Sequence, residues 1–415
     1  MINRRSFLQQ SLAVVSLGIG VPSVFSKAVA AAAEEKASAS VAGKTLIVVQ
    51  MAGGVDGLNT VIPYTDAAYH AGRSALAVPE ADMLIVDDRI AFHPSLAALK
   101  SEYDAGNLAV IEGVGYPQPN LSHFKSMDIW QSADPANSAG EGWLGRYFEG
   151  FADAEGHPLV GLSVDRSLPS AFAAEGASVP TVLDVESFRL QSARGAPNPD
   201  PRLTSLRKLY DLYRPASTPF AALLDTTLDG AYDASIELAA AHAAYEPAIP
   251  YPESSLASGL RLLAELIDAG GSDGSPLRVG HVRIGGFDTH TDQTARLDEL
   301  LLTTSGAIAA FWQDIVSHGH GEDVVVMTWS EFGRRVRENG QAGTDHGTAG
   351  PMFLLGSSVK GGFRGEPPSL TDLDDGNLRF TTDFRSVYAT ILERWLEAPA
   401  DAILGQRFDQ LDLFV

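Results

Sequence analysis

The chain has 415 residues, 45% of them hydrophobic and 8% aromatic, which is enough apolar material for one large core or two medium ones. It contains no cysteine, so disulfides, iron–sulfur clusters, thiolate zinc sites and cysteine nucleophiles are excluded. Its 30 Lys and Arg residues face 52 Asp and Glu residues, a formal net charge of −22. Nucleic acid is therefore not an expected partner, and an anionic ligand would need a local positive centre such as a metal ion or an arginine cluster.

Residues 1–33 resemble a cleaved export signal. Arg4 and Arg5 precede Ser-Phe-Leu, an apolar stretch follows at 11–21, and small residues typical of a cleavage site fill 28–33. The apolar stretch is shorter than the roughly 20 residues that span a bilayer, so no transmembrane anchor is expected after cleavage. The paired arginines are similar to the twin-arginine signal, which predicts a periplasmic or otherwise exported protein. A cytosolic protein with a fortuitous basic start is the alternative.

Six short apolar or β-branched runs, each bounded by glycine or polar residues, predict the buried strands of a mainly parallel sheet. These runs are 45–51, 108–114, 159–164, 277–284, 324–329 and 352–355. Apolar residues at three- and four-residue steps predict helices over 297–315 and 384–396. Strands that alternate with helices indicate a doubly wound α/β fold, in which ligands bind at the carboxyl ends of the strands.

The stretch from about 165 to 274 has a different pattern and predicts a helical insertion or cap. The helices expected within it cover 202–213, 220–245 and 255–269. Residues 34–44, rich in Ala, Ser and Glu, predict a flexible leader. The expected organisation is therefore a signal peptide, this leader, and a single α/β domain over 45–415.

Carboxylates and imidazoles follow or precede four of the predicted strands. Asp288 and His290 are two residues apart, so an extended chain places both on one side, where they could grip one metal ion. Each such residue alone also fits a turn or a cap. Four segments that deliver them to one edge of the sheet predict a shared metal site. The candidate ligands are Asp56, Asp288, His290, Glu331, Asp345 and His346.

Ser122 and His123 stand where a helical pattern starts after the strand at 108–114. Free backbone N–H groups at a helix N-terminus favour an anion, so Ser122 is a candidate at an anion site, and a plain N-cap is its alternative. His123 could be a metal ligand, a general acid or a surface histidine. Arg334, or Arg146, could balance the charge of a phosphoryl group, and both also suit surface salt bridges.

The motifs taken together resemble the bacterial domain of unknown function 1501 family over nearly the whole mature chain. They are the twin-arginine leader and the segments 53–60, 120–124, 287–290, 329–334 and 345–347. This family is placed by remote similarity in the alkaline phosphatase and sulfatase superfamily. The resemblance therefore implies an alkaline phosphatase-like fold, with a nucleophile at a helix N-terminus that faces one or two metal ions.

The same resemblance implies roles for particular residues. Ser122 takes the place of the nucleophile, and Asp56 that of the metal ligand after the first strand. Asp288, His290 and His346 take the places of the ligands of one metal. Glu331 falls where an Asp-His pair normally stands, and its neighbour is Phe332 rather than histidine. A second metal site is then short of ligands unless His123 or Asp345 supplies one.

One divalent metal, either zinc, manganese or calcium, is therefore expected, and the second site is in doubt. The maturation signature of sulfatases is absent around Ser122, which argues against cleavage through formylglycine. The predicted function is an exported metal-dependent hydrolase of a phosphoester or related ester, with Ser122 or a metal-bound water as nucleophile. Its partner would be a small-molecule ester or an envelope component. The alternative is a non-catalytic envelope protein that binds a ligand or a protein partner on the same fold.

Overall fold

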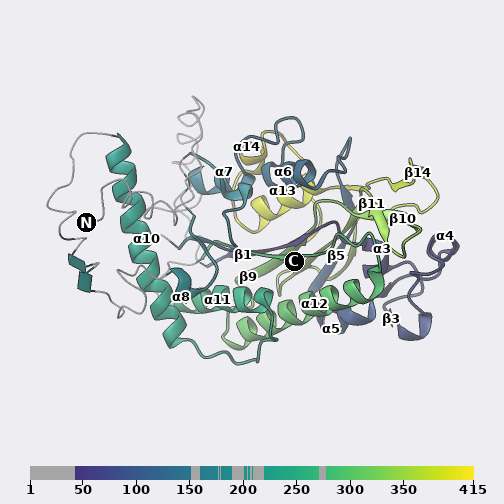
Figure 1. The fold of residues 1–415 in the computed structure, drawn as a ribbon, viewed down its shortest axis with the longest axis horizontal. Helices are drawn as coiled ribbons and strands as arrows, with labels where there is room; N and C mark the ends of the chain where they lie inside the picture. The colour runs from purple at the N-terminus through teal and green to yellow at the C-terminus, as the bar shows by residue number, and fades with distance from the viewer. Residues whose placement is uncertain are drawn as a thin grey trace, which may run out of the picture.

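The fold is built around one large mixed sheet, seen in a computed structural model (Figure 1). The structure describes residues 43–150, 159–175, 177, 179–188, 219–270 and 277–415, with a few isolated residues between 201 and 208. Within these residues the sheet has nine strands in the order β13-β5-β12-β9-β1-β8-β6-β7, with β16 also paired to β5. Its strands are β1 (Thr45–Ala52), β5 (Leu108–Gly115), β6 (Gly161–Val164), β7 (Thr181–Val182), β8 (Val279–Gly285), β9 (Val324–Trp329), β12 (Gly350–Leu355), β13 (Gly362–Arg364) and β16 (Thr382–Asp383).

The predicted α/β class with a mainly parallel sheet is confirmed, and each of the six predicted runs forms a strand. β1 pairs in parallel with both β8 and β9, and β6 pairs in parallel with β8 and β7. One strand departs from this pattern, because β12 runs antiparallel to both β5 and β9. The carboxyl ends of the parallel strands and the amino end of β12 therefore meet at the same edge of the sheet. This geometry explains how residues before β12 join residues that follow β1, β5, β8 and β9.

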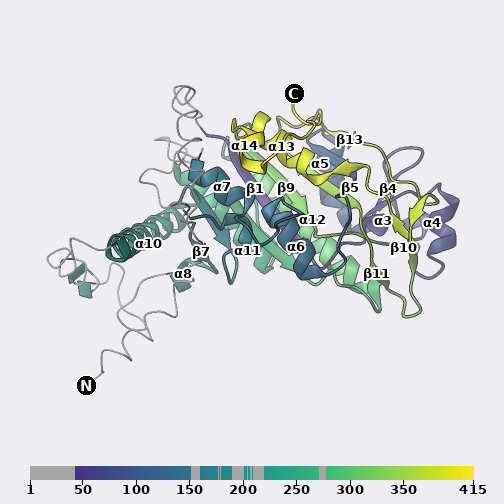
Figure 2. The same ribbon diagram turned by 90° about the horizontal axis from the view of Figure 1, so that it is seen from above.

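Helices cover both faces of the sheet (Figures 1 and 2). One face packs α11 (Ser255–Gly270), α12 (Gln293–Ser317) and α5 (Ala97–Asp104) over odd-numbered β1 residues such as Ile47 and Val49. The other face packs α6 (His123–Ser132), α7 (Trp143–Gly150), α13 (Phe384–Arg394) and α14 (Ala400–Leu404) over Leu46 and Val48. The strict alternation along β1 explains why a strand with every residue buried serves two separate cores.

Two of the helices expected between 165 and 274 are present as α10 (Pro219–Ala244) and α11. α11 contributes Leu260 and Leu263 to the core beneath the sheet, and α10 packs against α11 (Figure 2). The same stretch also holds β7 and α8 (Val185–Phe188), which were not predicted. The helix expected at 202–213, the signal peptide at 1–33 and most of the leader lie outside the described residues. Among the helices that are described, none is long and apolar enough to cross a membrane.

Short elements gather at the end of the sheet where the strands β1, β8 and β9 finish. A hairpin of β10 (Arg334–Glu338) and β11 (Thr344–His346) lies there, with Arg334 directly opposite His346. The remaining elements are α3 (Gly57–Thr60), β2 (Val61–Ile62), α4 (Ala67–Gly72), η1 (Glu80–Asp82), β3 (Leu84–Ile85), β4 (Ala91–Phe92), η2 (Pro94–Leu96), η3 (Ser170–Phe172), β14 (Leu373–Asp374) and β15 (Asn377–Leu378).

Glu112 on β5 makes the stability of the fold depend on pH. Burial, only partly offset by Arg89, raises the pKa of this carboxyl to about 7. The carboxyl thus binds its proton more tightly in the folded state than in the unfolded chain. Its contribution to the free energy of unfolding is fully present below about pH 4 to 5 and is lost as pH rises through about 7. We expect Glu112→Gln to unfold in urea as the wild type does at about pH 4 and to be about 3 kcal/mol more stable at about pH 8.5. Equal stability of the two proteins at pH 8.5 would contradict this, and exposed Glu299→Gln is the control.

Candidate metal centre

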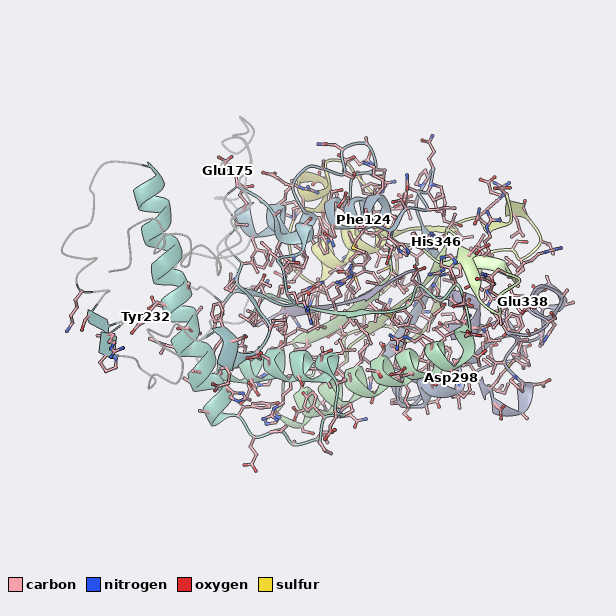
Figure 3. All side chains as sticks on the ribbon, in the orientation of Figure 1. Phe124, Glu175, Tyr232, Asp298, Glu338 and His346 are labelled. Atoms are coloured by element: carbon pink, nitrogen blue, oxygen red, sulfur yellow. The ribbon has the colours of Figure 1, made fainter. Side chains whose placement is uncertain are left out.

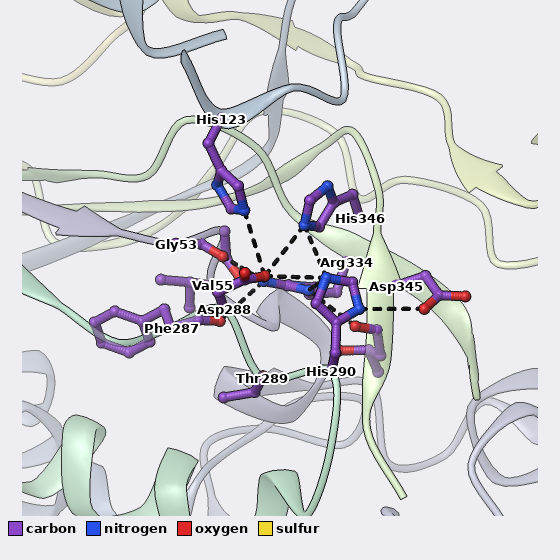
Figure 4. A network of polar contacts seen from close by, with 12 residues as sticks. Gly53, Val55, His123, Phe287, Asp288, Thr289, His290, Arg334, Asp345 and His346 are labelled. Atoms are coloured by element: carbon purple, nitrogen blue, oxygen red, sulfur yellow. Dashed lines mark hydrogen bonds and ion pairs between the residues drawn. The ribbon is translucent and has the colours of Figure 1, made fainter. Parts of the chain in front are cut away.

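Three histidines and one aspartate from distant segments meet at the sheet edge (Figure 4). His123 is the first residue of α6, and His346 is the last residue of β11. Asp288 and His290 follow β8 directly, in the loop before α12. Figure 3 labels His346, which ends the β10–β11 hairpin, and Phe124, which follows His123 on α6. Residues from α6, from the loop after β8 and from β11, which are far apart in the sequence, thus form one cluster.

The ε nitrogens of the three imidazoles converge on one carboxylate oxygen. Asp288 Oδ1 lies 3.3 Å from His123 Nε2, 3.1 Å from His290 Nε2 and 3.1 Å from His346 Nε2. The Nε2 atoms of His290 and His346 are 2.9 Å apart. Ligand atoms of His123, Asp288 and His346 all lie within 4.8 Å of one another, which is compatible with binding to one ion.

The opposite side of each imidazole faces an oxygen atom that can only accept a hydrogen bond. The three pairs are His123 Nδ1 with Glu331 Oε1 at 2.8 Å, His290 Nδ1 with Asp345 Oδ1 at 3.3 Å, and His346 Nδ1 with the Leu121 carbonyl at 2.8 Å. A neutral imidazole therefore carries its hydrogen on Nδ1 in all three cases and presents the lone pair of Nε2 to the centre. This arrangement of acceptor, imidazole and converging Nε2 is typical of histidines that bind metals.

The donor set fits a divalent cation. Three lone pairs and a carboxylate oxygen at 2.9 to 3.3 Å repel one another unless a proton or a metal ion lies between them. Imidazole and carboxylate ligands of tetrahedral zinc sit at about 2.0–2.2 Å from the ion, which places neighbouring ligand atoms about 3.3–3.6 Å apart. In addition, His123 Nε2 is buried and has no hydrogen-bond partner. A small outward movement of the side chains is enough to admit the ion.

The charges and the burial at the centre favour an ionised Asp288 and a neutral His346. Burial raises the pKa of Asp288, but the hydrogen bond and the positive charge of Arg334, together with the adjacent His346, outweigh burial and lower the pKa to about 2. Burial lowers the pKa of His346. His123 differs, because its hydrogen bond to Glu331 raises its pKa. The outer carboxylate thus makes His123 more basic than His346, and a more basic imidazole binds a cation more strongly.

Arg334 is fully buried and holds the centre together rather than reaching outward. Its Nε donates to the Gly54 carbonyl at 2.7 Å, Nη1 to Thr344 O at 2.9 Å, and Nη2 to Asp288 Oδ1 at 2.7 Å and Phe287 O at 3.0 Å. With these donors engaged, a bidentate contact with a phosphoryl group is not available. The structure therefore corrects the predicted role of Arg334, which positions Asp288. Arg146 likewise donates to backbone carbonyls, those of Ile403 and Ser132.

Asp56 is buried in a separate polar network and is not open to a metal. Its carboxylate forms an ion pair with Arg73, in which both side chains have no exposed surface, and it accepts a hydrogen bond from Gln293 Nε2 at 2.5 Å. It also caps α3 by accepting from the backbone N–H of Asn59 at 3.3 Å. The structure thus corrects the predicted role of Asp56 from ligand to structural carboxylate.

Glu331 and Asp345 lie behind the imidazoles, one step from the converging atoms. Glu331 is fully buried, and its Oε1 accepts both from His123 and from the Gly53 N–H at 2.9 Å. Asp345 accepts from Asn339 Nδ2 at 3.1 Å, and this bond and the one from His290 lower its pKa. The structure therefore gives both carboxylates an orienting role instead of the predicted direct ligation.

Ser122 is exposed and caps α6 only through its backbone position. Its side chain makes no capping hydrogen bond, and its N–H donates to Asn120 Oδ1 at 2.9 Å. Phe332, buried beside the centre, packs its ring at 4.8 Å from that of His123 and 4.7 Å from that of His346. Gly54 has φ +76°, and a Cβ there would lie 2.4 Å from the Phe332 ring, so glycine is required at this position.

Several residues that build the centre and the polar network of Asp56 could not be identified from the sequence. The carbonyl of Leu121 carries no side-chain signal at all. Arg73 caps the C-terminus of α4, 17 residues after Asp56, and Gln293 begins α12, 237 residues after it, and no spacing rule links them. From the sequence, Phe332 was noted only because a histidine was expected at its position. Its packing against His123 and His346 could not be predicted.

Glu331 and Asp345 orient two of the imidazoles. We therefore expect Glu331→Gln and Asp345→Asn to bind the metal more weakly than the wild type, with a dissociation constant about 10- to 100-fold higher. Competition with a chromophoric chelator measures this affinity. Exposed Asp375→Asn is the control. Complete loss of the metal in Glu331→Gln, at unchanged stability, would instead make Glu331 a direct ligand.

The chain has low similarity to several solved structures. The C-terminal periplasmic domain of EcEptC from Escherichia coli, in a complex with Zn, matches with a TM-score of 0.37 and 11% identity over 76% of this chain and 73% of that one. The PsFucS1 sulfatase from Pseudoalteromonas sp. gives 0.36 and 11% over 94% and 75%. The phosphonate monoester hydrolase of Agrobacterium radiobacter gives 0.33 and 10% over 88% and 78%. Similarity this low carries no argument about chemistry here.

No curated protein matches the chain. A family model described as a protein of unknown function (DUF1501) matches residues 43–392, which include every element that contributes to the centre. The chain belongs to the DUF1501 family.

Proposed function

We propose that this protein is an exported, metal-dependent hydrolase of a phosphoester or related ester. The observation that carries the proposal is the convergence of three imidazole Nε2 atoms and a carboxylate oxygen, with each Nδ1 held by an acceptor. Such a set is costly to keep in a fold unless a cation occupies it. The four residues that would hold one divalent ion are His123, Asp288, His290 and His346.

A divalent ion supplies Lewis acidity, which polarises an ester oxygen and makes a water or hydroxyl group a stronger nucleophile at neutral pH. The chain's own residues fix the geometry. Arg334 anchors Asp288 and draws the loops after β1 and β8 together through the carbonyls of Gly54 and Phe287. Ser122 precedes His123 at the exposed N-terminus of α6, where free backbone N–H groups favour an oxyanion.

The experiment is elemental analysis of the mature protein purified without chelator, followed by assay on nitrophenyl phosphate, bis(nitrophenyl) phosphate, nitrophenyl sulfate and nitrophenyl acetate. We expect about one zinc, manganese or calcium ion per chain, and turnover of a phosphoester that is lost with chelator and restored by metal. Ser122→Ala distinguishes the nucleophiles. A fall of at least about 10³-fold in kcat assigns the attack to Ser122, and unchanged kcat assigns it to water.

A second candidate is a non-catalytic envelope protein that binds a ligand or a protein partner at this centre. It is favoured by Phe332, which packs against two of the imidazoles, and by the exposed Ser122, whose side chain makes no capping hydrogen bond. A bound metal without turnover of any of the four esters would support it. A folded protein without metal would contradict the hydrolase. Export through residues 1–33 is part of both proposals.

A further inference from the structure

A row of polar side chains crosses the sheet beneath α6, apart from the histidine cluster. Arg283 on β8, Gln50 on β1 and Trp329 on β9 are neighbours in register, at the same level of the sheet. His281 lies one step earlier on the same face of β8, beside Ser163 of β6. These residues lie on the α6 face because they alternate in step with Leu46 and Val48, which belong to that core.

Three buried polar atoms in this region have no hydrogen-bond partner. They are Gln50 Nε2, His281 Nε2 and Trp130 Nε1, and their residues are 1%, 1% and 2% exposed. Trp130 on α6 stacks on Trp329 at 5.4 Å, so its indole lies close to the row. Buried polar groups are almost always hydrogen-bonded, so three unpaired atoms on one face indicate a place for an additional hydrogen-bonding group.

The region also holds a cation without a partner. Arg283 is exposed, and it takes part in none of the ion pairs formed among the described residues. Asp165, just beyond the end of β6, uses its Oδ1 to accept the Arg166 N–H at 2.6 Å. His281 is neutral, because burial and then the charge of Arg283 lower its pKa to about 3. In a chain with a net charge of −22, an unpaired arginine at a strand end is a local positive centre.

We propose that Arg283 and Gln50, with the indole N–H of Trp130, form a binding site for an oxyanion group such as a phosphate, sulfate or carboxylate. The guanidinium, the amide NH₂ and the indole N–H are all donors, and only an acceptor-rich group satisfies them together. Gln50 is three residues before Gly53, and Trp329 is two residues before Glu331, so this site and the metal centre share one sheet edge. If the proposed function holds, on which this last step rests, the substrate is an ester that carries a second acidic group.

The test uses metal-free, chelator-treated protein and the probes inorganic phosphate, sulfate and acetate at constant ionic strength, with binding followed by calorimetry and by thermal unfolding. We expect at least one of these anions to bind the wild type and to raise its Tm. Arg283→Gln should weaken this binding by about 10- to 100-fold, as expected for a charge-assisted hydrogen bond. Arg283→Lys should retain part of it, and Gln50→Leu should weaken it several-fold.

Two variants make the result specific. Arg296→Gln removes another exposed arginine, one that is paired with Glu299 at 3.1 Å, and should bind as the wild type does. His290→Ala removes a predicted metal ligand and should also leave anion binding unchanged. Absence of binding in the wild type, or equal loss in Arg283→Gln and Arg296→Gln, would overturn the site. If the purified protein contains no metal and hydrolyses no ester but still binds an anion in a way that depends on Arg283, the anion site is supported and the proposed hydrolase function is contradicted.

Discussion

Replacing His290 or His346 with alanine is expected to abolish the metal content of the purified protein and any ester hydrolysis with it. Each Nε2 atom lies 3.1 Å from Asp288 Oδ1, so each variant removes one of four converging donors. Loss of a residue that only hydrogen-bonds to a ligand lowers the affinity for the metal by about 10- to 100-fold, so loss of a ligand itself should lower this affinity by more than about 100-fold. Elemental analysis and kcat/KM for the best phosphoester measure the two effects.

The control for these variants is His70→Ala. His70 is an exposed histidine on α4 whose Nε2 contacts the Tyr64 carbonyl at 2.7 Å, far along the chain from the centre. It should keep the wild-type metal content and activity. A His346→Ala protein with a full complement of metal would show that the imidazoles converge for another reason and would withdraw the metal assignment.

Replacing Asp56 with asparagine is expected to destabilise the fold strongly and to leave metal binding unchanged. The substitution leaves Arg73 buried without its counter-charge, and breaking one partner of such a buried pair costs about 3–5 kcal/mol. Urea unfolding gives the free-energy difference, and elemental analysis of the folded protein at low temperature gives the metal content. The exposed pair Arg296–Glu299 provides the control, where Glu299→Gln should cost less than about 1 kcal/mol.

The opposite pattern, intact stability with loss of the metal, would restore Asp56 as a ligand. The experiment thus separates two roles that the sequence alone could not distinguish. In the sequence, Asp56 among glycines is compatible with a turn, a cap or a ligand. In the structure, the ion pair with Arg73 and the hydrogen bond from Gln293 show that Asp56 is a structural carboxylate, and no sequence motif links these residues to Asp56.

The sequence predicts the sheet well because its strands are buried on both faces and appear as continuous apolar runs. Val324–Trp329 and Thr45–Ala52 are examples in which every residue is buried. The antiparallel direction of β12 could not be predicted in this way, since an apolar run has no direction. Short edge strands such as β13 and β16 have only two or three residues and give no periodic signal.

The sequence locates the centre but does not assign roles within it. Strand ends indicated Asp288, His290 and His346, which converge in the structure. Glu331, Asp345 and Arg334 were predicted to contact the metal or the substrate, whereas in the structure each hydrogen-bonds to a residue of the centre. Hydrogen bonds across the sheet edge decide which carboxylates face the centre, and the sequence does not reveal them. His123 was left open between several roles, and only the position of α6 places its Nε2 beside Asp288.

The β10–β11 hairpin has a consequence for how the centre forms during folding. It supplies both Arg334, which anchors Asp288, and His346, and it follows β9, the strand that pairs with β1. His123 and His346 are separated by 222 intervening residues. Contacts between such distant segments close late, after the local structure. Retention of the metal ion should therefore report on completion of the fold, and a chain that ends before residue 334 should neither assemble the centre nor hold an ion.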